Sequence, residues 1–121
     1  MYIGKEDNFQ KTCIKYLRAA HPRLQAIHVP NGGYRNVREA AKFKAMGVVA
    51  GVPDILIFNP VYDANRTKII ASGLAIELKV KGGKVRDTQR DFMNRLSSNG
   101  WICEVIWDLK KFESVLKEHY F

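Results

Sequence analysis

Gly51-Val-Pro-Asp-Ile-Leu-Ile-Phe58 is an apolar run that predicts a strand, and it carries an acid, Asp54, near its start. A second run, Leu74-Ala-Ile-Glu-Leu-Lys-Val80, predicts another strand and carries Glu77 and Lys79. Because side chains alternate faces along a strand, Glu77 and Lys79 point the same way, while the apolar residues between them point into a core. If the two strands pair, Asp54 lies beside Glu77.

Two neighbouring carboxylates need nearby positive charge to compensate their repulsion. At about 4 Å and an effective dielectric near 20, two ionised carboxylates repel each other by roughly 4 kcal/mol. A divalent metal and a nearby ammonium group would offset that repulsion. Asp54 and Glu77 are hard oxygen ligands suited to Mg²⁺ or Mn²⁺, and the main-chain carbonyl of Leu78 offers a third oxygen. Lys79 would hold the attacking water or neutralise developing charge, which is the arrangement of a metal-dependent phosphodiesterase.

Each of these features also has an ordinary structural explanation. A Glu-x-Lys sequence on a strand usually belongs to a solvated face or to a cross-strand ion pair, and Pro53-Asp54 is often a simple turn. The catalytic interpretation is favoured by the combination. An acid lies inside an apolar stretch in each of two strands, and a lysine lies on the matching face of the second.

Composition limits the function further. The chain has 121 residues, which predicts one domain over 1–121, and a formal net charge of +8 favours a polyanionic partner such as nucleic acid. Cys13 and Cys103 have no metal-binding spacing, so we expect them to be reduced core residues of an intracellular protein. No signal peptide or membrane span is predicted, and the expected location is the cytoplasm, or a nucleus if the source has one.

Periodicity and turn signals divide the chain into helices and strands. The final helix is expected to be capped by Asp108, and Gly47 and Gly100 are expected to end two earlier helices. The order predicts an α/β sandwich with a mixed sheet. Helices are predicted at 5–20, 37–46, 87–99 and 109–116, strands at 26–29, 51–58, 74–80 and 101–107, a turn at 30–33, and a surface loop or hairpin at 61–73.

At this point the chain resembles a known family. Gly51-Val-Pro-Asp54 followed by Ile76-Glu77-Leu78-Lys79 resembles the signature of the PD-(D/E)XK nucleases. The surrounding residues resemble the VRR-NUC branch, and within it the small stand-alone phage and bacterial proteins. The likeness spans residues 6–107 and also rests on Glu6, Pro30-Asn31-Gly32-Gly33, Gly47 through Asp54, Gly83 and Gln89.

The resemblance implies a restriction-endonuclease-like core, with a central mixed β-sheet flanked by helices, that cleaves DNA with a divalent metal. It also implies that small members act as homodimers on branched DNA such as four-way junctions. By this likeness, Asp54 and Glu77 bind the metal and Lys79 is the catalytic lysine. Glu6 is a nearby acid that reaches a water held by the metal, and Gln89 orients the lysine or the nucleophile.

The chain departs from the family at one place. Where the family often has Ser or Thr with Pro at the start of the helix that carries Gln89, this chain has Arg86-Asp87. Asp87 is therefore expected to supply the helix cap instead.

Two basic clusters flank the predicted site. Each is either a solvated face or a set of phosphate contacts, and their position beside the site favours phosphate contacts. Neither contains a base-reading module, so recognition of DNA shape is favoured over recognition of sequence. His28 is expected to be a satisfied, half-buried strand residue, not a general base. The candidate DNA-binding residues are Arg35, Arg38 and Lys42 in one cluster, and Lys81, Lys84, Arg86 and Arg90 in the other.

The predicted function is a Mg²⁺- or Mn²⁺-dependent endonuclease that cleaves four-way (Holliday) junctions. A flap or nicking endonuclease of replication or repair on the same core is the alternative. A non-catalytic DNA-binding module is a further alternative. Its expected mark is the loss of an acid or of the lysine, whereas Asp54, Glu77 and Lys79 are all present.

Overall fold

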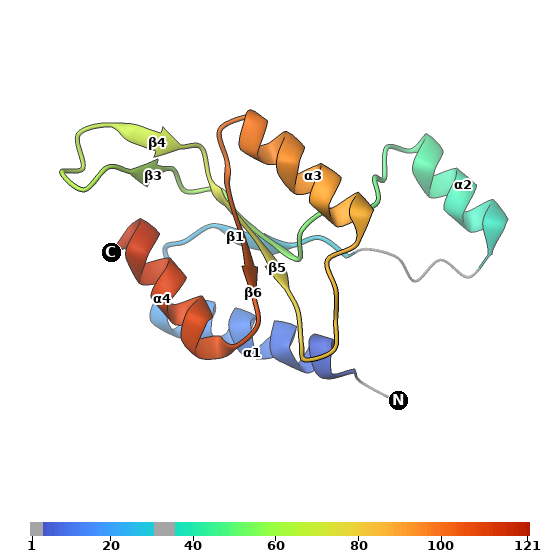
Figure 1. Cartoon of the computed structure of the whole chain (residues 1–121), viewed down its shortest axis with the longest axis horizontal. Coiled ribbons are helices and arrows are strands. Elements are labelled where there is room, and N and C mark those ends of the chain that lie inside the picture. The colour runs from blue at the N-terminus through green and yellow to red at the C-terminus, as the bar shows by residue number, and fades with distance from the viewer. Residues whose placement is uncertain (1–3, 31–35) are drawn as a thin grey trace.

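The computed structural model describes residues 4–30 and 36–121, and its centre is a four-stranded sheet (Figure 1). The strand order is β1-β2-β5-β6. The pairs β1–β2 and β2–β5 are antiparallel, whereas β5 and β6 are parallel, which confirms the expected mixed sheet. The strands are β1 (Ala26–His28), β2 (Ile55–Ile57), β5 (Leu74–Leu78) and β6 (Ile102–Ile106).

Helices cover both faces of this sheet. Helices α1 (Lys5–Ala20) and α4 (Leu109–Tyr120) contact each other and pack on one face, and α3 (Asp87–Ser98) packs on the other (Figure 1). The result is the expected α/β sandwich. In the described part of the chain, no helix has the length and apolar character needed to cross a membrane.

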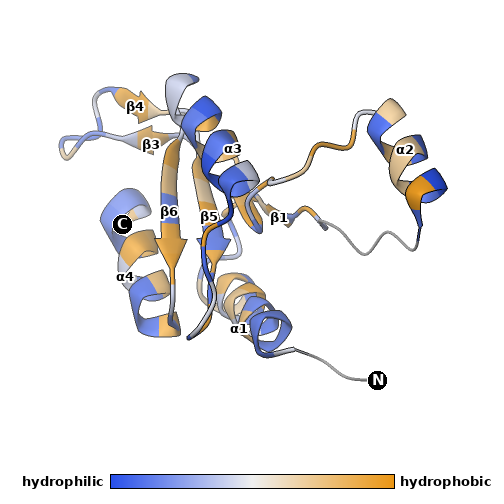
Figure 2. Ribbon diagram, turned by 45° about the vertical axis from the view of Figure 1, so that its right-hand side comes forward, coloured by the Kyte–Doolittle hydropathy of each residue, from blue (hydrophilic) through white to orange (hydrophobic). Residues whose placement is uncertain are grey.

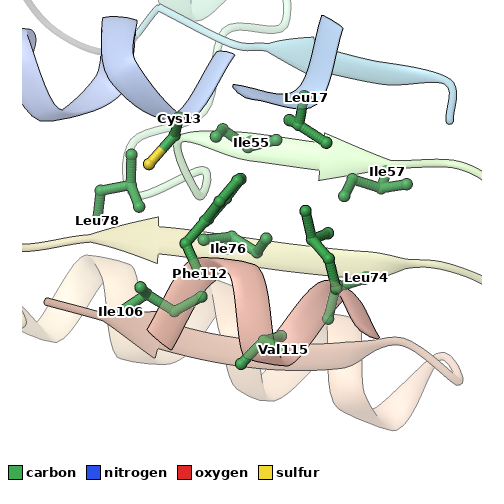
Figure 3. Packing of buried hydrophobic residues seen from close by; sticks show 11 residues of the cluster. Cys13, Leu17, Ile55, Ile57, Leu74, Ile76, Leu78, Ile106, Phe112 and Val115 are labelled. Carbon is green, nitrogen blue, oxygen red and sulfur yellow. The ribbon is translucent and has the colours of Figure 1, made fainter. Parts of the chain in front are cut away.

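The main core lies between the sheet and the α1–α4 layer (Figure 3). Alternate residues of β2 and β5 point into it, as the period-2 pattern predicts. Full burial of a valine, leucine or isoleucine side chain stabilises the fold by about 1.5–3 kcal/mol. The buried cluster consists of Cys13, Leu17, Ile55, Ile57, Leu74, Ile76, Leu78, Ile106, Phe112, Val115 and Leu116.

The helix ends follow the sequence signals. Helix α1 spans the predicted residues, and the side chain of Asp108 accepts the backbone N–H of Lys111 at 2.8 Å, which caps α4 as expected. Gly47 and Gly100 follow the ends of α2 and α3 with φ angles of 100° and 88°, a region that favours glycine.

All four predicted strands of the sheet are shorter than expected, and those predicted over 26–29 and 74–80 end at His28 and Leu78. The strand predicted over 51–58 covers only Ile55–Ile57, because Gly51 has a positive φ and Pro53 has no N–H for a ladder. The strand predicted over 101–107 ends at Ile106, and Trp107 is exposed. The polar segment 61–73 forms a hairpin of β3 (Val61–Tyr62) and β4 (Ile69–Ala71), one of its two expected forms.

Helix α2 (Val37–Ala45) differs from the others because none of its residues is buried. Figures 1 and 2 show it standing apart from the sheet. Its N-terminus is capped by the side chain of Asn36, which accepts the N–H of Glu39 at 2.8 Å. The predicted turn at residues 31–33 and the predicted DNA-binding residue Arg35 lie outside the described residues.

Candidate active site

Asp54 lies in a bend immediately before β2, and not inside the strand as predicted. Its Oδ2 atom accepts the backbone N–H of Leu78 at 2.8 Å. The side chain of Asp54, and not a further residue of β2, therefore satisfies this N–H at the end of β5. The register places Ile55 opposite Ile76, so the residue before β2 comes beside Glu77, as the pairing argument predicted.

Gly51 fixes this bend against helix α3. Its φ is 89°, and a Cβ atom there would collide with the backbone carbonyl of Thr88 and lie 2.9 Å from the backbone nitrogen of Gln89. Only glycine permits this approach and this backbone conformation together. The glycine of the Gly-Val-Pro-Asp motif thus brings the Asp54 bend and the first turn of α3 into contact.

Glu77 is buried in β5, with 1% of its surface exposed. Its Oε1 atom accepts the side-chain amide of Gln89 at 3.4 Å, and its Oε2 atom is buried without a hydrogen-bond donor in the described part of the chain. Burial raises the pKa of Glu77 well above its usual range. The neighbouring carboxyl of Asp54 raises this pKa further, whereas the charge of Lys79 opposes the shift.

Glu6, in the first turn of α1, completes a group of three acids. One carboxylate oxygen from each of Glu6, Asp54 and Glu77 lies within 4.8 Å of the others. A divalent cation fits this donor set for two reasons. Carboxylate oxygens are the ligands that Mg²⁺ and Mn²⁺ prefer, and the unpartnered Oε2 of Glu77 lacks the positive partner that its burial requires.

Lys79 follows β5 on the same side as Glu77 and is also buried, with 4% of its surface exposed. Its backbone N–H donates to the carbonyl of Ile106 at 3.0 Å, which continues the pairing with β6 beyond the end of the strand. A Cβ atom on Gly83 would lie 3.6 Å from Cδ of Lys79, so the chain after β5 folds back over the lysine stem. The ammonium group is therefore carried by a rigid element.

Gln89 links the start of α3 to the acids. Its Oε1 atom accepts the backbone N–H of Arg86 at 2.9 Å, and its Nε2 atom donates to Glu77. Asp87 was expected to cap this helix, but it is the first residue of α3 and its carboxylate pairs with Arg90 at 2.9 Å. The expectation of an Asp87 cap was wrong because the helix begins one residue earlier. Arg86 is the N-cap, and its carbonyl accepts the N–H of Arg90 at 2.9 Å.

His28 has a contact that the sequence did not reveal. Its Nδ1 atom lies 2.7 Å from the backbone carbonyl of Asp54, so this nitrogen carries the proton. The residue is exposed and not half-buried as expected, although it is satisfied at Nδ1 as expected. The pairing of β1 with β2, in which His28 is opposite Ile55, brings the ring to this position.

The predicted basic residues fall into two different settings. Arg38 and Lys42 are exposed on α2, the helix without buried residues. The second cluster follows β5 directly and reaches into α3, the two elements that carry Lys79 and Gln89. Its members are Lys81, Lys84, Arg86 and Arg90, all exposed.

A mixed sheet with two acids and a lysine grouped at one end defines the class of PD-(D/E)XK nucleases. The family model described as the VRR-NUC domain matches residues 5–107, and the chain therefore belongs to the VRR-NUC family. This domain is a nuclease domain, which implies a phosphodiesterase that acts on DNA.

A solved structure named VRR_NUC domain protein is similar in fold, with a TM-score of 0.75 and 23% sequence identity. The match covers 99% of this chain and 91% of that chain. No curated protein sequence matches the chain significantly.

Proposed function

We propose that residues 1–121 form one nuclease domain that hydrolyses DNA phosphodiester bonds with a bound Mg²⁺ or Mn²⁺ ion. The observation that carries this proposal is the grouping of Glu6, Asp54 and Glu77 within 4.8 Å, beside the buried Lys79. Glu77 and Lys79 are buried, whereas Glu6 and Asp54 are not fully buried, and buried charges are expensive in a protein that does not use them.

Each side chain has a proposed role. Asp54 and Glu77 hold the cation together with the main-chain carbonyl of Leu78, and Glu6 accepts a hydrogen bond from a water at the same site. A bound divalent cation supplies Lewis acidity, which lowers the pKa of a water and offsets charge on the phosphate. Lys79 orients the attacking water and neutralises the charge that develops on the phosphate oxygens. Its place on a rigid element favours this role.

Gln89 is proposed to act as a positioning residue. Its amide holds the Oε1 atom of Glu77, which leaves Oε2 directed to the cation. The family resemblance implied that Gln89 orients the lysine or the nucleophile. The hydrogen bond to Glu77 favours orientation of the metal ligand instead.

The proposed substrate is branched DNA, a four-way junction, and the proposed assembly is a homodimer. A four-way junction with two-fold symmetry is cut in two strands and needs one active site for each. A symmetric dimer supplies two active sites. The net charge of +8 supports a polyanionic substrate. In this proposal Arg35, Arg38, Lys42, Lys81, Lys84, Arg86 and Arg90 contact phosphates.

The test is cleavage of a labelled four-way junction with Mg²⁺, Mn²⁺ or EDTA, beside flap and linear duplex substrates and a Lys79→Ala protein. Paired, symmetric, metal-dependent cuts that the variant does not make are the expected result. Cutting of flap or linear DNA in place of the junction would keep the active site and discard the junction role. Binding without any cutting would favour a non-catalytic module.

A further inference from the structure

A shallow hollow of about 630 Å³ lies along α1, beside His28 of β1. Ile14 lines it, and three cations border it: Lys11, Lys15 and Arg18. A second hollow of about 400 Å³ shares Ile14, Arg18 and His28 with the first. The two hollows therefore form one surface, which we call the α1 groove.

The cations of the α1 groove form a stripe. Lys11, Lys15 and Arg18 are four and three residues apart, so they share one helix face, separated along the axis by about 6 and 4.5 Å. Within residues 4–30 and 36–121, none of them pairs with an acid, although Asp7 lies four residues before Lys11. The helix dipole explains a cation at Arg18, in the last turn, but not the two lysines in the middle of the helix.

The α1 groove begins beside the candidate active site, although none of the three acids lines it. Gln10 lines the groove one helical turn after Glu6, and its Nε2 atom is buried without a hydrogen-bond acceptor in the described residues. His28 lines it from the other side and contacts the carbonyl of Asp54 at 2.7 Å. Groove residues therefore lie next to two of the three acid-bearing positions, Gln10 one turn after Glu6 and His28 against the backbone of Asp54.

The spacing of the stripe suits a nucleic-acid backbone. Along the axis of duplex DNA, one strand advances about 3.4 Å per phosphate, so a stripe of roughly 10 Å that runs along this axis spans about three nucleotides. Lys11 is five residues from Glu6, about 7.5 Å along the helix, or roughly two nucleotides from the site. An acidic protein would also match the charge, but it gives no reason for the groove to begin beside a phosphodiesterase site.

We infer that the α1 groove binds the DNA strand on one side of the cleaved bond, with Lys11, Lys15 and Arg18 contacting its phosphates. This inference rests on the proposed function and extends it to a surface outside the two basic clusters that flank the catalytic strand. The cations lie on α1, whose other face is fixed in the core by Cys13 and Leu17. The groove therefore holds the strand at a fixed position relative to the acids.

The test compares two triple variants that remove the same charge. The groove variant is Lys11→Gln/Lys15→Gln/Arg18→Gln. The control variant is Lys68→Gln/Arg95→Gln/Lys117→Gln, which also changes two lysines and one arginine, all exposed. The control residues precede β4 or lie in the last turns of α3 and α4, toward the end of the sheet opposite Glu77. Circular dichroism melts establish that both variants fold.

Binding is measured by fluorescence anisotropy in EDTA, with a labelled four-way junction and a labelled duplex over a range of salt concentrations. The groove variant should bind at least about tenfold more weakly near 0.1 M salt, and its salt slope should decrease by about 2.7, or 0.9 per lost contact. The control variant should keep the wild-type slope. A Lys11→Arg/Lys15→Arg/Arg18→Lys protein should also keep it, because the charges remain.

Equal losses in the groove and control variants, or no loss in either, would overturn the inference. In that event metal-dependent cleavage by the wild-type and control proteins would leave the proposed function intact. Wild-type protein that cleaves no DNA with either metal would overturn the proposed function, and this inference with it.

Discussion

Two pairs of residues, each with one acid and one base, lie in opposite environments. One pair is Glu77 and Lys79 at the end of β5, and the other is Asp87 and Arg90 at the start of α3. The first two residues are 1% and 4% exposed. The side chains of Asp87 and Arg90 are 96% and 58% exposed and form an ion pair at 2.9 Å. One pair is buried among other charges, and the other is solvated.

This contrast identifies the charges that the fold holds at a cost in free energy. An exposed ion pair contributes about 0–1 kcal/mol and is weakened by salt. Burial of charges costs several kcal/mol per ion unless partners compensate, and Oε2 of Glu77 has no donor in the described residues. The buried pair is therefore the one that function explains, and the exposed pair serves as its internal control.

The largest effect is expected at the buried pair and at Asp54. Lys79→Ala should lower the single-turnover cleavage rate at least about 10³-fold, because the charge on the transition state loses its fixed partner. Asp54→Asn should do the same while keeping an acceptor for the N–H of Leu78. DNA binding should change little in either variant. Asp87→Ala is the matched control, and a comparable loss of rate in it would remove the distinction between the two pairs.

Two glycines with positive φ also differ in their surroundings, because Gly51 is packed against α3 and Gly82 lies in open space. Gly51→Ala should destabilise the fold by about 2 kcal/mol or more and abolish cleavage, because its Cβ meets the backbone of Thr88 in addition to the strain of its φ. Gly82→Ala has a similar φ but open space around it, so only the strain of about 1–2 kcal/mol applies. Urea unfolding and cleavage rates measure the difference. Equal destabilisation by both substitutions would contradict the contact with α3.

The pH dependence of stability should also separate buried from exposed acids. The pKa of Glu77 is raised from 4.5 to about 9 by burial and by the neighbouring carboxyl. Without a divalent ion, its contribution to stability is present below pH 4.5 and is lost as pH rises toward 9. Glu77→Gln should reduce this loss, and Asp87→Asn should not. Thermal melts in EDTA should show a difference in Tm of about 5 °C or more between the two variants at pH 8.

Addition of Mn²⁺ should reverse the trend, because a cation displaces the proton of Glu77. The rise in Tm on adding Mn²⁺ should be larger at pH 8 than at pH 5.5, and binding should release a proton. Titration calorimetry in buffers of different ionisation enthalpy measures this release. A pH-independent effect of Mn²⁺ would contradict binding at Glu77.

A smaller effect is expected at Gln89. Gln89→Ala should lower metal affinity or cleavage by about 10–100-fold, the range typical of residues that orient a metal ligand. An increase in the Mn²⁺ concentration should restore part of the rate. Asn94→Ala, an exposed change on the same helix, should leave the rate unchanged. Loss of rate that no concentration of metal restores would assign Gln89 a role other than holding Glu77.

The smallest effect concerns the exposed pair itself. Asp87→Asn should strengthen DNA binding by about two- to threefold, because it frees Arg90 to contact phosphate. Lys84→Ala should weaken binding and flatten its salt dependence more than Arg90→Ala does, since Arg90 is partly neutralised already. Anisotropy over a salt series distinguishes the three variants. A larger loss of binding in Arg90→Ala than in Lys84→Ala would show that the ion pair does not persist on DNA.

Local patterns predicted much of this fold. Helix α1 matched its predicted bounds, and the Asp108 cap formed, because capping groups and periodicity act over a few residues. The grouping of Asp54 with Glu77 was also predictable. It needs only that the two acid-bearing runs pair, and the register of Ile55 with Ile76 provides that pairing.

Contacts between distant segments were not predictable in the same way. The hydrogen bond from Gln89 to Glu77 depends on where α3 packs. The expected Asp87 cap was wrong because α3 begins one residue earlier, with Arg86 as its N-cap. The contact of His28 with Asp54 depends on β1 being the neighbour of β2. No spacing in the sequence encodes these choices.

The residue types and their order were enough to indicate the chemistry: two acids and a lysine in apolar runs, a glycine that permits a tight bend, and an excess of positive charge. Residue type and alternation along a strand are local properties, so they are visible without a fold. The family resemblance placed Glu6 near the metal, and the fold brought its carboxylate to the other two acids and formed the groove that the cations of α1 line beside them. Those arrangements arise from packing across the sheet, where segments far apart in the chain meet.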